Sequence, residues 1–473
     1  MILTRSFLAK PIYLRQRTRF LFLHMTSLSL PQKPTYLPFR DTTDFYGLFQ
    51  KIHEHTDMCF LFESLGDESA LSRYSIIGFS PEHILRASGN TLTTDRETTK
   101  VANAYHALRE ITPQNVLSRA YCGGLVGYLG YDAVNYSEPA LKIRSHPSFP
   151  TLIFGAYTDG LVSDKMTGEI FYFFYTKNRL QFIKRISRLG LKKTRVRIRS
   201  LGDTLTKEAH KKLVLAVKEE IVSGNTFQCE IGFKTEYEIR GSPLPIYTAL
   251  REVNPSPYMF YLKYDDVALL GASPELLFRL GDREMETFPL AGTIRRGKNA
   301  KQDIALARIL LNDQKEIAEH NMLVDLHRND LGRVAEFGTV KVRRLMDIKK
   351  FSHVQHISSE IAGIMRRGED MFSGLAANFP AGTLSGAPKF ESMKIIDRLE
   401  NAPRGPYGGA VGHFGFNGNC TFTIPIRSFF VSGSYGYTQN ASGIVHDSSP
   451  EQEYEEVKRK GEAMNKVLNE FKT

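Results

Sequence analysis

Two pairs of glutamates are the side chains whose types and spacing point most directly to chemistry. Glu316 and Glu319 stand in KEIAEH, and Glu453 and Glu456 stand in PEQEYEE, 137 residues further along. Residues three apart lie on one face of a helix, so each pair can aim two carboxylates at one point. Two such faces meeting across a cleft would hold a hard cation such as Mg²⁺ beside an anionic substrate. A solvated helix surface is the alternative for any single pair, so the surrounding motifs decide between the two.

Two further segments contain groups that suit anions. FPAGTLSGAPK, at 379–389, is a glycine-rich turn that predicts a helix starting near Ser385, where backbone N–H groups would face a ligand. Arg427 in IPIRS lies on an apolar strand and needs a partner, either a structural salt bridge or a substrate carboxylate bound bidentately. GTIRRGK, at 292–298, matches the core of a phosphate-binding loop, but Asn299 stands where Ser or Thr should reach Mg²⁺. We therefore set nucleotide hydrolysis aside.

The positive charge of the chain is confined to two segments. The net charge of the 473 residues is +11. Residues 1–40 carry seven Lys or Arg and residues 181–200 carry eight, with no acid in either, and the rest of the chain holds 47 basic against 51 acidic residues. Because the body is not basic, we expect no nucleic-acid partner. No stretch reaches the roughly 18 apolar residues of a membrane span, so we expect no membrane partner either.

The first 25 residues are arginine-rich and contain no acid, which is typical of organellar transit peptides. A start at Met25 is the alternative interpretation. We expect a cytoplasmic protein, with organellar targeting by residues 1–24 left open. The cysteines show no paired or C-x-x-C spacing, which indicates neither a disulfide framework nor a zinc site. They are Cys59, Cys122, Cys229 and Cys420.

Runs of apolar residues separated by turns predict an α+β fold, with a large antiparallel β-sheet core flanked by helices. Residues 41–180 indicate mostly strands with short helices, and residues 408–446 return to strands. Hairpin turns are predicted where short Gly-, Asp- or Asn-containing pairs separate apolar runs. These pairs are Asp265-Asp266, Gly281-Asp282, Asn417-Gly418 and Ser432-Gly433.

Three helices are predicted in the second half of the chain. The first runs from Thr206 to near Gly224, a residue type that commonly follows a helix end. A long helical pattern over 302–330 carries the first glutamate pair. The last helix has Ser449 as its N-cap, followed by Pro450, with Gln452 completing a capping box. That start places the second glutamate pair near the positive end of the helix.

Eight motifs occur in order between residues 205 and 467: ASPELLF, PLAGTIRRG, KEIAEHNMLVDLHRNDLGRV, FSHVQHI, FPAGTLSGAPK, RGPYGGAVG, IPIRS and GIVHDSSPEQEYEE. Together they resemble the chorismate-utilising enzymes, and most closely the anthranilate synthase component I family, whose N-terminal part residues 41–180 also resemble. The resemblance implies a basic N-terminal extension at 1–40, a regulatory-type region at 41–200 and a chorismate-binding catalytic region at 201–473.

The activity implied by this resemblance is Mg²⁺-dependent conversion of chorismate and ammonia to anthranilate and pyruvate, the first committed step of tryptophan biosynthesis. The enzyme would be a lyase acting on chorismate. Aminodeoxychorismate synthesis, isochorismate synthesis and a non-catalytic relative are the alternatives.

The resemblance also implies roles for single residues. The four paired glutamates would hold Mg²⁺, which would hold the ring carboxylate of chorismate. Glu275 would be the general acid for departure of the C4 hydroxyl, a role that needs a pKa raised by burial. Arg427 would take the carboxylate of the enolpyruvyl arm. The implied catalytic set is Glu275, His356, Gln228 and Thr293. The implied substrate-binding set is Thr383, Tyr407, Arg427, Gly443 and Lys460.

Two positions favour anthranilate over its alternatives. Related isochorismate and salicylate synthases place a water-activating lysine where Gln228 stands, and an amide cannot serve as that base. Aminodeoxychorismate synthases commonly carry a nucleophilic lysine where Ala291 stands. The chain also departs from the family's Ala-Gly-Ala-Gly run, because residues 440–443 read Asn-Ala-Ser-Gly, and the methyl of Ala441 could weaken substrate binding.

Two kinds of partner follow from the same resemblance. None of the cysteines lies in the G-x-C-x-G elbow of a glutaminase, so ammonia from glutamine would require a glutamine amidotransferase subunit in a hetero-oligomer. Phe62-Glu63-Ser64 and the segment 254–259 resemble the family's regulatory segments. L-tryptophan would therefore act as an allosteric inhibitor at a site containing Glu63, Ser64, Pro257, Tyr258 and Met259.

Overall fold

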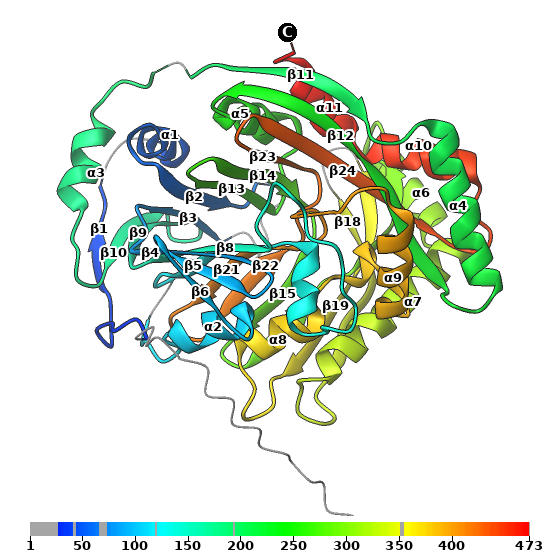
Figure 1. Cartoon of the computed structure of the whole chain (residues 1–473), viewed down its shortest axis with the longest axis horizontal. Helices are drawn as coiled ribbons and strands as arrows, with labels where there is room; N and C mark the ends of the chain where they lie inside the picture. The colour runs from blue at the N-terminus through cyan, green and yellow to red at the C-terminus, as the bar shows by residue number, and fades with distance from the viewer. Residues whose placement is uncertain are drawn as a thin grey trace, which may run out of the picture.

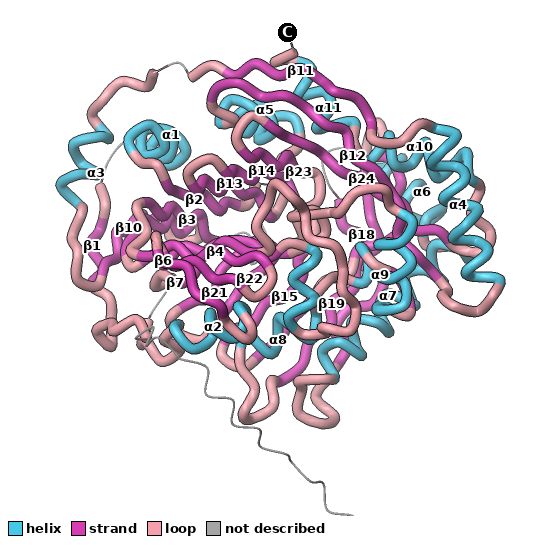
Figure 2. The backbone as a smooth tube through the Cα atoms, viewed as in Figure 1, coloured by secondary structure: helices cyan, strands magenta, loops and turns pink. Residues whose placement is uncertain are grey.

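The computed structural model describes residues 27–40, 44–65, 73–118, 121–192, 194–350 and 354–472. The targeting function predicted for residues 1–24 lies outside the described residues. Two antiparallel sheets of twelve strands each form the body of this described part, and helices surround them (Figures 1 and 2). The predicted α+β fold with an antiparallel sheet core is therefore confirmed.

The first sheet joins strands from both halves of the chain. Its order is β1 (Thr35–Pro38), β10 (Glu169–Phe174), β9 (Asp159–Asp164), β3 (Tyr74–Phe79), β2 (Met58–Glu63), β13 (Tyr258–Tyr264), β14 (Val267–Ser273), β23 (Ser428–Ser432), β24 (Tyr435–Ile444), β12 (Gln228–Gly241) and β11 (Val196–Asp203), with β20 (Gly386–Ala387) beside β12. The long strands β12 and β24 extend from this sheet toward α4, α9 and α10 (Figure 1).

The second sheet is built in the same mixed way. Its order is β17 (Leu290–Arg295), β19 (Val354–Ile364), β16 (Glu284–Thr287), β15 (Leu276–Gly281), β22 (Cys420–Thr423), β21 (Ala410–Gly415), β7 (Gly124–Leu129), β8 (Leu152–Tyr157), β4 (His83–Ser88), β5 (Thr91–Thr94) and β6 (Glu97–Lys100), with β18 (Lys341–Lys350) beside β19. The sequence boundary near residue 200 therefore does not separate the sheets, and the predicted division into regions stays a prediction.

Buried apolar side chains fill the space between the two sheets. Phe60 and Phe260 of the first sheet belong to the same core cluster as Phe154 and Phe414 of the second. A second cluster lies on the other face of the first sheet, where strand residues such as Leu61 pack against several helices. Each sheet of the described chain is thus covered, and its strands bury their apolar side chains.

The helices are α1 (Phe45–His55), α2 (Ala104–Ile111), α3 (Leu180–Ser187), α4 (Lys207–Val222), α5 (Leu244–Val253), α6 (Ala300–Leu310), α7 (Gln314–Gly332), α8 (Met371–Asn378), α9 (Lys389–Leu399), α10 (Pro450–Lys460) and α11 (Glu462–Asn469), with 3₁₀ turns η2 (Tyr131–Tyr136) and η3 (Gly382–Leu384). The helix predicted from Thr206 is confirmed as α4, and the Thr206 side chain accepts a hydrogen bond from the Ala209 N–H. In the described part of the chain, no helix is long and apolar enough to cross a membrane.

Three predictions about helix boundaries are wrong. The long helix over 302–330 is two helices, because Asp313 caps a new one by accepting from the N–H groups of Lys315 and Glu316. The N-cap Ser449 and the following Pro450 are confirmed, but the Ser449 side chain makes no cap hydrogen bond, so the capping box with Gln452 is absent. The glycine-rich turn does not start a helix near Ser385.

The reason for this last difference is a short strand. Gly386 and Ala387 pair with β12 as β20, and this extended backbone delays the start of α9 until Lys389. Pro388 follows the strand with a φ of −66° and precedes the helix. Its fixed backbone dihedral suits a helix entry, since it lacks only an N–H that a helix start would leave unused.

Candidate active site

The two glutamate pairs are held by α7 and α10. Burial and the neighbouring Glu316 raise the pKa of Glu319 to about 7, and Glu456 adds to this effect. Burial also raises the pKa of Glu316, with Asp313 and Glu456 contributing. Like charges disfavour ionisation of one another, so Glu316, Glu319 and Glu456 act on each other across the space between the helices.

The carboxylates fit a hard divalent cation by charge and donor type. Glu453 is buried, and its Oε2 has no hydrogen-bond partner among the described residues. A buried carboxylate oxygen without a partner is costly, and a cation would satisfy it. No three Asp, Glu, His or Cys side chains in the described ranges are grouped closely enough to hold a metal ion. The donors are therefore present, but the structure does not gather them at ligand distances.

Gln228, at the start of β12, connects the glutamates of α7 to the first sheet. Its Nε2 donates to Glu319 Oε1 over 3.1 Å, and its Oε1 is buried without a partner in the described structure. Gly443 lies on the adjacent strand β24, where a Cβ would come within 2.5 Å of Gln228 Nε2 and 3.2 Å of Glu230 Oε2. A methyl group at 443 would therefore displace the amide that faces Glu319.

The predicted general acid is buried between β14 and β15. Burial raises the pKa of Glu275 to about 8, although a hydrogen bond from Thr383 Oγ1 to its Oε1, at 3.0 Å, opposes the shift. Thr383 comes from η3, within the glycine-rich segment, and it fixes the orientation of the carboxyl group. Glu275 is thus protonated at neutral pH, which is the form that a general acid needs.

The β17–β19 ladder places a neutral histidine beside Arg427. Thr293 and His356 are register partners, and His356 Nδ1 lies 2.9 Å from the carbonyl oxygen of Gly292 and 3.0 Å from Thr293 Oγ1. A carbonyl can only accept, so we assign the proton to Nδ1, which leaves Nε2 facing Arg427 Nη2 at 3.4 Å. Burial, reinforced by Arg427, lowers the pKa of His356 to about 3.

Arg427 forms no salt bridge with any carboxylate in the described residues, which argues against a purely structural role. Its guanidinium is largely enclosed and lies close enough to Glu275 to be stabilised by that carboxylate when it is ionised. Its φ is +52°, an uncommon value for a residue other than glycine. Strained backbone of this kind clusters at functional sites, where the surrounding fold holds it in place.

The comparisons with known proteins agree on one family. Residues 57–466 match the chorismate binding enzyme family. The chain belongs to this family. An anthranilate synthase component 1 from Leptospira biflexa is 52% identical over 94% of this chain and 98% of its own length. One from Methanothermobacter thermautotrophicus is 44% identical, over 89% of this chain and 92% of its own length.

Solved structures give the same result. Anthranilate synthase component I from Streptococcus pneumoniae TIGR4 has a TM-score of 0.75 and 29% identity, covering 84% of this chain and 93% of the other. The menaquinone-specific isochorismate synthase from Escherichia coli has a TM-score of 0.71 over 93% of this chain and 96% of the other. At 19% identity, this second likeness shows the fold alone.

The remaining predicted substrate-binding residues of this chorismate-binding enzyme lie near the same groups. Tyr407 is buried, and burial together with Glu230 raises the pKa of its hydroxyl. Lys460, at the end of α10, donates to the Ala441 carbonyl at 2.8 Å and pairs with Glu456 at 3.0 Å. The structure therefore places Lys460 between α10 and β24, and it places Tyr407 close enough to Glu230 for that carboxylate to affect its pKa.

The departure at Ala441 is accommodated by its neighbour on β12. Ala441 pairs with Gly232, and a Cβ at Gly232 would lie 2.7 Å from the Ala441 methyl. The methyl group thus occupies space that the absent side chain of Gly232 leaves.

The segments predicted to bind an effector lie together on neighbouring strands. Met259 of β13 is the register partner of Glu63 of β2. Arg251 binds the Glu63 carboxylate through Nε and Nη2, at 2.6 and 2.9 Å, and Tyr247 donates to it at 2.8 Å. Glu63 is therefore already paired with a cation within the chain.

The other residues of this predicted effector site differ in their exposure. Ser64 is buried, and its Oγ has no hydrogen-bond partner in the described part of the chain. Pro257 and Tyr258 are partly buried at the start of β13. The unpaired hydroxyl of Ser64 is thus the group in this cluster that most needs a partner.

Sequence reasoning missed two features of the site. Glu230 is buried on the same strand face as Gln228, and burial raises its pKa to about 7 against the opposing charge of Lys460. Arg404 is buried in the RGPYGG motif, where it pairs with Glu400. The period-two spacing of Gln228 and Glu230 could have indicated a shared face, whereas nothing local indicated burial of the Arg404–Glu400 pair.

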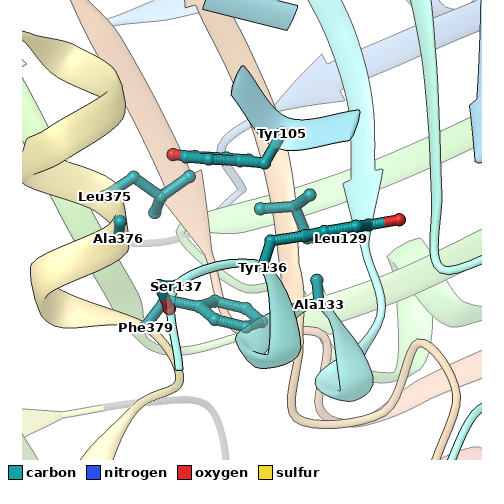
Figure 3. Close-up of a pocket in the computed structure, with 8 residues that line it drawn as sticks. All are labelled: Tyr105, Leu129, Ala133, Tyr136, Ser137, Leu375, Ala376 and Phe379. Atoms are coloured by element: carbon teal, nitrogen blue, oxygen red, sulfur yellow. The ribbon is translucent and has the colours of Figure 1, made fainter. Parts of the chain in front are cut away.

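A small cavity lies apart from these residues. It has room for about one water molecule and is lined mainly by apolar side chains of α2, η2 and α8 (Figure 3). The lining residues are Tyr105, Leu129, Ala133, Tyr136, Ser137, Leu375, Ala376 and Phe379. None of them is a predicted site residue, so this cavity is not the candidate active site.

Proposed function

We propose that this chain catalyses the conversion of chorismate and ammonia to anthranilate and pyruvate. The observation that carries the proposal is a buried Glu275, whose pKa burial raises to about 8, close to Arg427, a guanidinium without a carboxylate partner in the described chain. Relatives at up to 52% identity that carry the name anthranilate synthase component 1 support the same reaction. Chorismate is a dianion, and an arginine at one end with a cation site at the other matches its two carboxylates.

The proposed chemistry begins with the two carboxylates. Arg427 binds the carboxylate of the enolpyruvyl arm, while His356 accepts from the guanidinium and orients it. Mg²⁺, held by Glu316, Glu319, Glu453 and Glu456, would neutralise the ring carboxylate when bound. Both ends of the substrate are then fixed before any bond changes.

Glu275 then serves as the general acid. The lone pair of ammonia forms the new bond at C2, both ring double bonds shift toward C4, and the C4–O bond breaks as Glu275 protonates the leaving hydroxyl, which departs as water. The new ammonium group then gives its extra proton to solvent. Loss of the C2 proton and cleavage of the bond to the enolpyruvyl oxygen complete the aromatic ring, and the released enolpyruvate takes up a proton on its methylene carbon to become pyruvate. Thr383 holds Glu275 in place throughout.

Gln228 and Ala291 support anthranilate as the product. The Gln228 amide donates to Glu319 and has no basic nitrogen, so it cannot activate water. Ala291 is buried on β17 and carries no nucleophile. Neutral ammonia needs no such activation and attacks directly.

We also propose that a glutamine amidotransferase subunit supplies this ammonia in a hetero-oligomer. All four cysteines are buried and unpaired by disulfides. Burial raises the pKa of the Cys59 thiol to about 12, and it raises the pKa of the other three thiols as well. A buried thiol held in its protonated form is a poor nucleophile, so none of the four cysteines is suited to release ammonia from glutamine.

The purified chain is expected to form anthranilate from chorismate, Mg²⁺ and ammonium at alkaline pH, where free ammonia is abundant. With glutamine in place of ammonium, turnover should be absent until an amidotransferase subunit is added. EDTA should abolish turnover and excess Mg²⁺ should restore it. Product analysis by fluorescence and chromatography tests this. Accumulation of isochorismate or 4-amino-4-deoxychorismate, or turnover with glutamine alone, would contradict the proposal.

We propose that L-tryptophan inhibits the enzyme through the β2–β13 segments. The unpaired hydroxyl of Ser64 supports this proposal, and the Arg251–Glu63 pair supplies further charges for an amino acid. Ser64→Ala and Met259→Thr are each expected to weaken inhibition by about tenfold, the loss of roughly 1.4 kcal/mol of binding. Ser434→Ala, at an exposed turn, is the matched control. The measurement is the tryptophan concentration for half inhibition, and an unchanged value in both variants would reject the assignment.

A further inference from the structure

Lys460 lies among three oxygen atoms at the end of α10. Its Nζ donates to the Ala441 carbonyl at 2.8 Å, lies 3.0 Å from Glu456 Oε1 and 3.7 Å from Glu230 Oε1. Glu456 belongs to the glutamate pair on α10, whereas Glu230 belongs to β12. The ammonium therefore stands between two carboxylates that come from different elements.

Glu230 is held over the site by the backbone around it. Its side chain is buried, and its strand pairs with β24 so that Gly443 lies directly opposite. A Cβ at Gly443 would approach Glu230 Oε2 to 3.2 Å, so the glycine leaves the room that this carboxylate occupies. Lys460 is the basic side chain that the structure pairs with Glu230 in a salt bridge.

The contact between Lys460 and Glu456 conflicts with a cation site. A carboxylate oxygen that accepts from an ammonium is less available to a divalent cation, and the two positive charges repel each other. A cation bound through Glu456 therefore favours movement of Lys460 away from this carboxylate. Glu230 is already within ion-pair distance and can receive the ammonium after a small movement.

We propose that Glu230 is a positioning residue, which takes the Lys460 ammonium from Glu456 when a divalent cation binds. This inference rests on the metal site of the proposed function. Glu230 would keep the lysine beside the substrate pocket while it frees Glu456 for the metal. Without Glu230, Lys460 would remain on Glu456 and compete with the cation.

Calorimetric titration of the purified chain with Mg²⁺, without substrate, tests this competition. Glu230→Gln is expected to weaken Mg²⁺ binding by about tenfold, which is the effect of losing one charge-assisted interaction. Glu451→Gln is the matched control, because Glu451 lies on the same helix and pairs with Lys207 and Lys211 outside the site. It should bind Mg²⁺ as the wild type does. An unchanged affinity in Glu230→Gln would overturn the inference.

A second pair of variants separates positioning from simple loss of negative charge. In a Lys460→Gln background, Glu230→Gln should have no further effect on Mg²⁺ affinity, because the competing ammonium is gone. If the tenfold loss persists there, Glu230 acts on the metal by its own charge and the positioning role is wrong.

Two further measurements check that the variants fold and that the wild type binds Mg²⁺. Circular dichroism establishes that each variant is folded, and Glu230→Ala replaces Glu230→Gln if the amide prevents folding, with the same expected loss. Wild-type protein that binds no Mg²⁺ would overturn the proposed metal site and this inference with it. Wild-type binding with unchanged Glu230 variants would overturn the inference alone.

Discussion

Replacing Glu275 with glutamine is expected to lower kcat for anthranilate formation by at least about a hundredfold, the usual contribution of a positioned general acid. Glutamine keeps the shape of the side chain and the hydrogen bond from Thr383, but it cannot release a proton to the departing hydroxyl. The change removes an interaction made in the transition state, so kcat should fall more than KM rises. Steady-state kinetics with saturating ammonium measures both quantities.

The pH dependence of kcat provides the diagnostic readout. Burial raises the pKa of Glu275 to about 8, so the carboxyl group is protonated below that pH and loses its proton above it. At a constant concentration of free ammonia, kcat of the wild type should therefore fall as the pH rises through about 8. Glu275→Gln should lack this decline, since its amide does not titrate in this range.

Thr383→Val supplies the matched control for this assignment. The hydrogen bond from Thr383 to Glu275 favours the ionised form and lowers its pKa. Its removal should move the decline in kcat to higher pH while the general acid remains. The assignment fails if Glu275→Gln retains wild-type activity or the same alkaline decline.

The local pattern predicted the class of fold but not the order of the strands. Hairpins such as β13–β14 follow from two apolar runs joined by Asp265-Asp266, because such pairs are close in the sequence. The pairing of β2 with β13 joins segments that are far apart in the sequence, and Glu63 of β2 also contacts Tyr247 of α5, 184 residues away. Such a pairing depends on burial across the whole sheet, which a short window of sequence does not contain.

The active site, too, could be predicted from the sequence only in part. The resemblance to the family indicated Glu275 and Thr383, and the apolar strand around Arg427 indicated that this arginine needs a partner. They did not indicate that Thr383 would contact Glu275 across 108 residues, or that Glu230 would lie beside Lys460. Those contacts arise where the loop of η3, the strand β12 and the helix α10 meet, so tertiary packing determines them.

The Arg404–Glu400 pair is the clearest case of burial that sequence could not predict. The residues are four apart, a spacing that ordinarily indicates an exposed helical pair. Here both side chains are almost completely buried, at 2% and 4% exposure. Arg404 also donates to the carbonyl oxygens of Leu384, at 2.6 Å, and Glu230, at 2.8 Å. It therefore joins the turn that follows Thr383 to the strand that carries Glu230.

Arg404→Met is expected to lower the free energy of unfolding by about 3–5 kcal/mol, because it leaves the Glu400 carboxylate buried without its cation. Arg328→Met, which removes an exposed pair with Asp325, should cost no more than about 1 kcal/mol.

The double variant Glu400→Met/Arg404→Met should lose less stability than Arg404→Met alone, since it leaves no uncompensated charge. It should not recover fully, because the Gly232 N–H loses its partner and the Leu384 carbonyl loses the closer of its two donors. Chemical denaturation followed by circular dichroism measures all three variants. Equal losses in Arg404→Met and Arg328→Met would show that the buried pair does not hold the turn and the strand together.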